Sequence, residues 1–174
     1  MTVEDPLGPG ATESATFDEG RFRSVLGHFA TGVTVVTAID SDHGEPVGLS
    51  VNSFTSVSLR PPLVAFCASK SSTTWPRIRQ AGLFAVNVLA EHQEPVSRTF
   101  AARSHEKFKG LEWWPAPSGA PVLDEVLAWL DCTIEAEHDA GDHVLVIGRV
   151  KDLDVTDEGR PLIFYRGGYG GIER

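Results

Sequence analysis

A run of hydroxyl side chains between Gly48 and Ser72 is the part of the sequence best suited to bind a small polar molecule. Its first half mixes serine and threonine with apolar residues, at Ser50, Ser53, Thr55, Ser56 and Ser58. A flat polar ligand needs hydrogen-bond donors and acceptors beside apolar surface, and this pattern supplies both. The same pattern fits an ordinary edge strand whose hydroxyls face water, so the composition leaves both interpretations open.

Two further segments carry candidate chemistry. Ser69 to Thr74 lies at the predicted start of a helix, where hydroxyls and free N–H groups can hold a phosphate that Lys70 would neutralise. The alternative there is an ordinary helix cap. His143 follows Gly141-Asp142 and begins a predicted strand, so it either points into a cleft or is a turn histidine exposed to water.

Other kinds of site find less support. His138 and His143 have acids beside them, but such pairs are common in turns, and we predict no metal site. The sequence has no nucleotide-binding Gly-x-Gly-x-x-Gly after a strand, no P-loop and no Gly-x-Ser-x-Gly. Cys67 and Cys132 lie in apolar runs and are expected to be buried reduced thiols.

Length and composition limit the classes of protein to which the chain can belong. The chain has 174 residues, with 41% hydrophobic and 22% charged residues, which fits one globular domain. A net charge of −9 argues against binding to nucleic acid or to an anionic membrane surface. No apolar stretch is long enough to span a membrane, and the acidic N-terminus is unlike a signal peptide, so we expect a cytoplasmic protein. We expect a disordered tail over residues 1–17 and a single domain over residues 18–174.

Three helical segments are expected to position these groups. The first follows Phe17 and carries one apolar face, formed by Phe22, Val25, Leu26 and Phe29. The second covers Trp75 to Ala81 and ends at Gly82. The third is expected over residues 90–108.

Short strands account for most of the remaining chain. They are expected over residues 33–39, 47–59 (two strands or one bent strand), 63–68, 83–89, 123–137, 143–155 and 161–165. Gly48 would mark a bulge or a close approach, residues 111–121 a loop, 138–142 a turn and 166–171 a glycine-rich tail. Because strands do not alternate with long helices, the pattern predicts an antiparallel barrel with a few covering helices.

The candidate segments, taken together and in order, resemble the flavin reductase family with the FMN-binding split-barrel fold. Members are the small reductase components of two-component flavin-dependent monooxygenases. The resemblance covers roughly residues 20–170 and rests on Phe29–Thr37, Gly48–Leu59, Pro61–Val64, Phe84–Leu89, Phe100-Ala101, Lys107-Phe108, Gly141–His143 and Pro161-Leu162 to Tyr169. It implies a mainly β fold, an antiparallel Greek-key split β-barrel, in a homodimer. It also implies an oxidoreductase that reduces FMN or FAD with NADH or NADPH and passes the reduced flavin to a monooxygenase.

The resemblance also implies roles for individual residues. Those along the isoalloxazine ring would be Thr31, Val33 and Thr34, and those at its polar edge Ser50, Val51, Asn52 and Ser53. Those near the ribityl chain and phosphate would be Ala68, Ser69, Ser72 and Thr73. Lys107 and Phe108 would close the site. The nicotinamide nucleotide would contact the catalytic residue His143, together with Arg166 and Tyr169.

Two rival interpretations stay open at this point. One is a non-enzymatic protein on the same barrel that binds flavin tightly or carries electrons. The other is an interaction domain that binds no flavin. The absence of a catalytic triad or metal motif fits the reductase, because hydride transfer between two stacked rings needs little acid or base chemistry from the protein.

Overall fold

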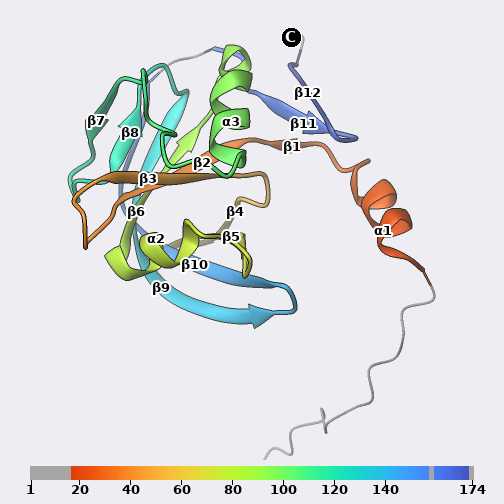
Figure 1. Cartoon of the computed structure of the whole chain (residues 1–174), viewed down its shortest axis with the longest axis horizontal. Coiled ribbons are helices and arrows are strands. Elements are labelled where there is room, and N and C mark those ends of the chain that lie inside the picture. Colours follow the sequence, from red (N-terminus) through yellow and green to blue (C-terminus); the bar gives the residue numbers. More distant parts are fainter. Residues whose placement is uncertain (1–16, 157–158, 173–174) are drawn as a thin grey trace, which may run out of the picture.

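Seven antiparallel strands form the main sheet of the computed structural model, which describes residues 17–156 and 159–172 (Figure 1). The expected N-terminal tail, except for Phe17, lies outside these residues. The sheet order is β3-β2-β6-β9-β10-β5-β4. The strands are β2 (Thr34–Ile39), β3 (Pro46–Val51), β4 (Thr55–Leu59), β5 (Pro62–Ser69), β6 (Leu83–Val88), β9 (Ala128–Ala140) and β10 (His143–Val155).

The sheet curls because its two outer strands are neighbours in sequence. β3 and β4 lie at opposite ends of the sheet order, yet residues 52–54 alone connect them. Three residues span at most about 10 Å, so the two edges must approach each other. The result is the expected antiparallel barrel, split where the edges meet, and the link between the edges carries Asn52 and Ser53.

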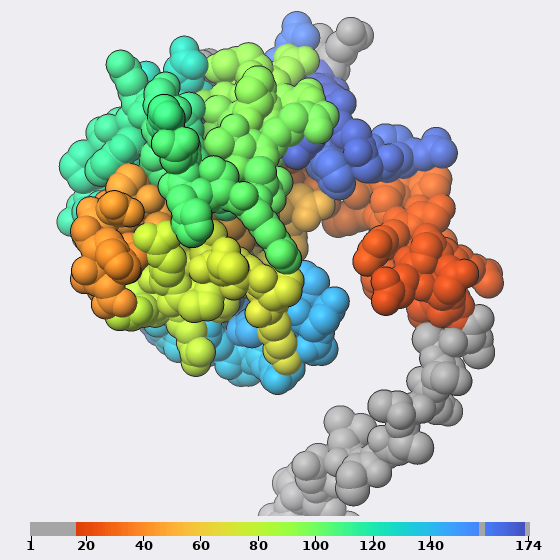
Figure 2. Space-filling model, viewed as in Figure 1, coloured from red at the N-terminus to blue at the C-terminus, as the bar shows by residue number. Residues whose placement is uncertain are grey.

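A second, small sheet forms an arm beside the barrel. It has the order β1-β11-β12 and comprises β1 (Thr31–Gly32), β11 (Ile163–Tyr165) and β12 (Gly168–Gly170). Helix α1 (Glu19–Leu26) precedes it, capped by the Asp18 side chain, which accepts a hydrogen bond from the Arg21 N–H. Every residue of α1 is exposed, and Figure 2 shows the helix standing apart from the barrel.

The remaining elements cover the barrel. Helix α2 (Trp75–Ala81) ends at Gly82, whose φ of 70° lies in the left-handed region that glycine favours. A short turn of 3-10 helix, η1 (Glu91–Gln93), leads into α3 (Glu94–Ala101). Strands β7 (Trp113–Pro115) and β8 (Pro121–Leu123) form a separate hairpin. None of the helices in the described residues is both long and apolar enough to cross a membrane.

Two apolar clusters hold these layers together. The first fills the barrel and includes Phe66, Phe84 and Ile78, all fully buried. The second joins α3 and the β7–β8 hairpin to the outside of the sheet and includes Phe100 and Trp129. Cys132 is fully buried, as expected, and burial raises the pKa of its thiol to about 12. Cys67, also expected to be buried, is only partly buried.

The structure corrects four sequence-based expectations. The helix expected over residues 90–108 ends at Ala101, and residues 102–110 form a loop. The loop expected over 111–121 contains most of the β7–β8 hairpin, and the glycine-rich tail contains strand β12. Residues 138–140 continue β9, so the turn there is only Gly141-Asp142. The expected helix after Phe17 is present as α1, and its apolar residues are exposed.

Candidate functional site

A cavity of about 350 Å³ opens where the link between β3 and β4, the end of β5 and the loop after α3 meet. We call it the main cavity. Nine of the sixteen residues that the sequence singled out line it: Ser50, Val51, Asn52, Ser53, Ser69, Ser72, Thr73, Lys107 and His143. Residues from four separate segments of the chain therefore meet here, and both halves of the hydroxyl run contribute.

The first half of the run forms one wall. The Ser53 hydroxyl accepts a hydrogen bond of 2.9 Å from the Cys67 N–H, which fixes the link against β5. The Ser50 hydroxyl is 3.0 Å from that of Ser97 on α3. Asn52 is exposed, so its amide, with two N–H donors and one oxygen acceptor, is free to meet a ligand.

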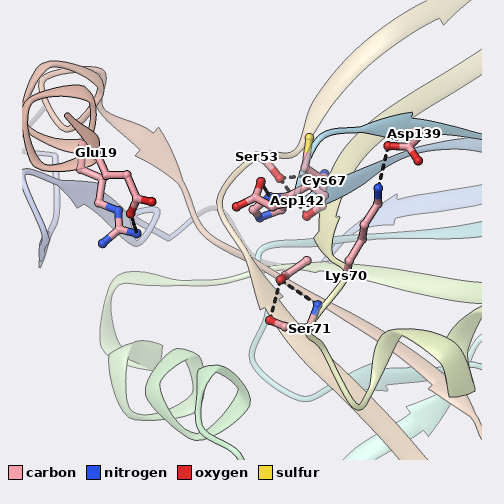
Figure 3. Close-up of polar contacts among 10 residues, drawn as sticks. Glu19, Ser53, Cys67, Lys70, Ser71, Asp139 and Asp142 are labelled. Carbon is pink, nitrogen blue, oxygen red and sulfur yellow. Dashed lines mark hydrogen bonds and ion pairs between the residues drawn. The ribbon is translucent and has the colours of Figure 1, made fainter. Parts of the chain in front are cut away.

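The second half forms the opposite wall, although its hydroxyls are partly used by the chain itself. Ser72 accepts hydrogen bonds from the Thr74 and Trp75 N–H groups, so two of the N–H groups expected to hold a phosphate are already occupied. The Ser69 and Ser71 hydroxyls are 2.9 Å apart. Figure 3 shows Lys70 paired with Asp139, with 2.6 Å between its Nζ and Oδ1, and Lys70 does not line the main cavity.

Lys107 supplies the cation that Lys70 does not. It is buried, and its ammonium donates to the Gly48 carbonyl at 3.1 Å and to the Phe100 carbonyl at 2.9 Å. The ammonium of Lys107 has three N–H donors, so these two bonds leave one donor unused. Within the described residues, no carboxylate forms an ion pair with Lys107. Burial lowers the pKa of this lysine, because removing a charge from water disfavours the charged form.

His143 lies at the rim of the main cavity. It begins β10 directly opposite Ser69 of β5, and 43% of its side chain is exposed. Its Nδ1 is 2.7 Å from the Asp142 Oδ1. A carboxylate can only accept, so Nδ1 carries a proton and donates to Asp142. The His143 side chain in turn lowers the pKa of Asp142.

Two predicted residues line a smaller groove of about 170 Å³ that continues the main cavity. Val33 and Tyr169 lie there, and Ser50 and Asn52 border both spaces. Tyr169 hydrogen bonds Ser97 at 2.9 Å, and Ser97 contacts Ser50, so three hydroxyls join the arm to the wall of the main cavity. Arg98 stacks over the Tyr169 ring, 4.8 Å from its centroid.

The other predicted residues lie away from both spaces. Thr34 and Ala68 have buried side chains inside the barrel, where the Thr34 hydroxyl donates to the Val51 carbonyl, so only their backbone remains for a ligand. Phe108 packs edge-on against Phe100, with ring centroids 5.0 Å apart, and supports the wall from behind. Arg166 is exposed at the β11–β12 turn and belongs to the arm.

The Thr31 hydroxyl is buried and has no hydrogen-bond partner within the described residues. Such a group is costly unless a ligand, water or a second chain completes it. Its position on β1 places it in the arm, close to the groove that Val33 lines.

Two residues that line the main cavity, Arg103 and Ser104, were not among the predicted site residues. Both lie in the loop that was predicted as the end of a helix over residues 90–108. Ser104 carries a signal that could have shown the break: its hydroxyl accepts from the Glu106 N–H, a short-range bond typical of serine in turns. In the described residues, no group of three His, Cys, Asp or Glu side chains could hold a metal ion.

Comparison with known proteins gives consistent results. Residues 26–173 match the family described as flavin reductase like domain. The reductase subunit HsaB of a flavin-dependent monooxygenase from Rhodococcus jostii is 49% identical over 171 residues, which cover 98% of this chain and 87% of that protein. The crystal structure of nitrilotriacetate monooxygenase component B from Mycobacterium thermoresistibile has a TM-score of 0.85 and 47% identity, covering 89% of this chain and 87% of that one. An NADH:FAD oxidoreductase from Streptomyces globisporus, solved with NAD and FAD fragments, has a TM-score of 0.84 and 38% identity, covering 90% and 93%.

Proposed function

The chain belongs to the flavin reductase like domain family, and from this premise we propose that it is an NAD(P)H:flavin oxidoreductase. It would reduce FMN or FAD by hydride transfer and supply the reduced flavin to a partner monooxygenase. The observation that carries the proposal is the main cavity, because it joins Asn52, Lys107 and His143, from separate segments of the chain, around one open space.

The side chains of the main cavity fit a flavin by their chemistry. The exposed Asn52 amide offers donors and an acceptor to the polar edge of the ring, and the neighbouring serine hydroxyls offer more. Lys107 and Arg103 bring positive charge to the lining of the main cavity, which favours the anionic parts of the ligand. When bound, the flavin supplies the chemistry, since it accepts a hydride from the nicotinamide.

His143 would position the nicotinamide nucleotide at the rim. Asp142 holds its imidazole through Nδ1, so the ring has a fixed orientation before the nucleotide arrives. His143→Ala is expected to lower turnover about tenfold or more while flavin affinity changes little. His138→Ala is the matched control, because His138 is an exposed histidine of β9 and does not line the main cavity. A large loss of flavin affinity in His143→Ala would contradict this role.

We also propose that two copies of the chain pair through α1 and the arm. Phe22, Val25, Leu26 and Phe29 are exposed on this segment, with Phe29 73% exposed, and among the described residues no part of the barrel covers them. Leu26→Glu is expected to convert a dimer into a monomer in sedimentation, since it places a charge in the apolar contact. Leu59→Glu, at a residue 90% exposed on the barrel, should leave the mass unchanged. A monomeric wild-type protein would contradict the proposal.

A steady-state assay tests the main proposal. Oxidation of NADH and of NADPH is followed with FMN and with FAD in all four combinations, and at least one is expected to turn over. We expect the protein to work in the cytoplasm, where nicotinamide nucleotides are available. A protein that stays yellow after dialysis and oxidises neither nucleotide would instead favour the non-enzymatic flavin carrier.

A further inference from the structure

A cavity of about 380 Å³ lies between the start of α3 and the end of β8, and we call it the acidic groove. Its lining comes from η1 and α3, from residues 110–112 and from residues 123–125. It shares no lining residue with the main cavity. In Figure 1, β8 and strand β11 of the arm lie on opposite sides of α3, so the groove lies away from the proposed dimer contact.

The floor of the acidic groove is apolar. Leu123 is only 2% exposed, and Val96 and Leu111 pack with it in the second apolar cluster. Gln93 is buried between two of the lining segments, and its amide donates to the Asp124 carbonyl at 2.8 Å, which ties η1 to the end of β8. Such a floor can bury the alkyl part of a ligand.

The rim of the acidic groove carries negative charge. Glu112, Asp124 and Glu125 are exposed, and none of the lining residues is a lysine or arginine. The Asp124 N–H donates to the Glu112 carbonyl at 3.1 Å, so these two residues lie side by side. Glu125 has a partner, since its Oε2 lies 3.2 Å from Nε2 of His92. Across the described residues, neither Glu112 nor Asp124 forms an ion pair. Two uncompensated carboxylates above an apolar floor are complementary to a basic side chain with an alkyl stem, such as arginine.

An exposed tryptophan extends the acidic groove. Trp113 follows Glu112 directly and pairs across the β7–β8 hairpin with Leu123 of the floor. It is 37% exposed, although it is a large apolar residue. Tryptophan is enriched where proteins meet, and the face of its ring attracts a guanidinium group. The surface around the groove therefore suits a protein segment better than a small ion.

The acidic groove and the main cavity are built from the same two segments. Helix α3 contributes Val96 to the groove and Phe100 to the main cavity, and these residues are about 6 Å apart along the helix axis. The loop after α3 contributes Lys107 to the main cavity and continues to Gly110 in the groove. A protein bound in the groove would therefore lie beside the wall of the main cavity.

We propose that the acidic groove docks a basic segment of the partner monooxygenase, with an arginine side chain bound by Glu112 and Asp124. The inference rests on the proposed function, which supplies a partner that takes up reduced flavin. Docking at this place brings that partner beside the cavity from which the flavin is released and leaves the main cavity open. The planar guanidinium has enough N–H donors to bond both carboxylates, and its alkyl stem can cover Val96 and Leu111.

The probe for the test is a fluorescein-labelled peptide of alternating leucine and arginine, whose binding is followed by fluorescence anisotropy. The double variant Glu112→Gln/Asp124→Asn removes two charges with little change in shape and is expected to weaken peptide binding about three- to tenfold. The matched control is Asp152→Asn/Asp154→Asn, which changes the net charge equally at exposed residues of β10 outside the groove. A peptide with glutamate in place of arginine should not bind.

The same variants separate this inference from its rivals. Equal peptide affinities of the two double variants would overturn it, because binding would then follow net charge alone. A monomeric Glu112→Gln/Asp124→Asn protein in sedimentation, beside a dimeric wild type, would also overturn it, since the groove would then join two copies of the chain. This variant should reduce flavin at the wild-type rate, because neither residue lines the main cavity, and a loss of turnover would contradict a docking role. Absence of flavin reduction by the wild type would overturn the proposed function, whereas the peptide titration does not depend on flavin.

Discussion

Gly48→Ala is expected to destabilise the protein and to weaken flavin binding together. An added Cβ at this position would lie 2.6 Å from Cε1 and 2.9 Å from Cδ1 of Phe100, well inside ordinary contact distance. Phe100 cannot retreat easily, because it is only 1% exposed and Phe108 packs edge-on against it. Forcing extra volume into a packed core costs about 1–3 kcal/mol. For a domain of this size, that predicts a fall in melting temperature of about 2–12 °C.

The loss of flavin affinity follows from the same geometry. Phe100 lines the main cavity, and the Gly48 carbonyl accepts a hydrogen bond from Lys107, so a shift of either residue disturbs the cavity wall. Thermal unfolding and fluorescence titration measure the two effects on the same samples. Gly170→Ala is the control, because a Cβ there meets nothing within 4 Å.

A double-mutant cycle makes this prediction sharper. Phe100→Leu removes the ring that the alanine would strike, so Gly48→Ala should cost less in its presence than in the wild type. Equal costs in the two backgrounds, or a Gly48→Ala variant as stable as Gly170→Ala, would refute the steric argument.

Three further predictions concern polar groups. Hydrogen bonds from the Asp42 N–H, His43 and Arg77 lower the pKa of Asp40 to about 2. The stability that Asp40 contributes is therefore present above pH 3.8 and is lost as the pH falls through about 2. In urea titrations at several pH values, Asp40→Asn should lack this acid dependence. Tyr169→Phe removes the bond to Ser97 and should weaken flavin binding about two- to tenfold, whereas Tyr165→Phe, on the exposed arm, should not. Lys107→Met removes the donor that two carbonyls share and should lower the unfolding free energy by about 1–3 kcal/mol. An unchanged urea midpoint would show that Lys107 does not hold the loop after α3 in place.

Local signals predicted part of the fold well. Helix α2 has the predicted bounds because a proline near its start and Gly82 after its end are signals carried by single residues. Strand β10 also has the predicted bounds, since alternating apolar residues mark a strand with one face packed. Both halves of the hydroxyl run border one cavity, as the ordered motifs implied.

The parts of the fold and site that the sequence did not predict depend on contacts between residues far apart in the chain. The loop after α3 is held by Lys107, whose two backbone acceptors include Gly48, far away in the sequence. Strand β12 is defined by its pairing with β11, and its glycines give no side-chain pattern. The Ser50–Ser97–Tyr169 chain joins three distant segments, so no spacing within the sequence could have indicated it.

The pairing of β5 with β10 also has a consequence for how the protein acquires its activity. Ser69 and His143 face each other across this pair, although most of the sequence of the barrel lies between them. Contacts between distant segments form late, because closing a long loop costs entropy before the contact can repay it. During refolding, hairpin pairs such as β2–β3 can form early, whereas the rim of the main cavity must await the β5–β10 pair. Recovery of flavin binding should therefore coincide with the last kinetic phase, and newly made chains would not capture flavin before the barrel is complete.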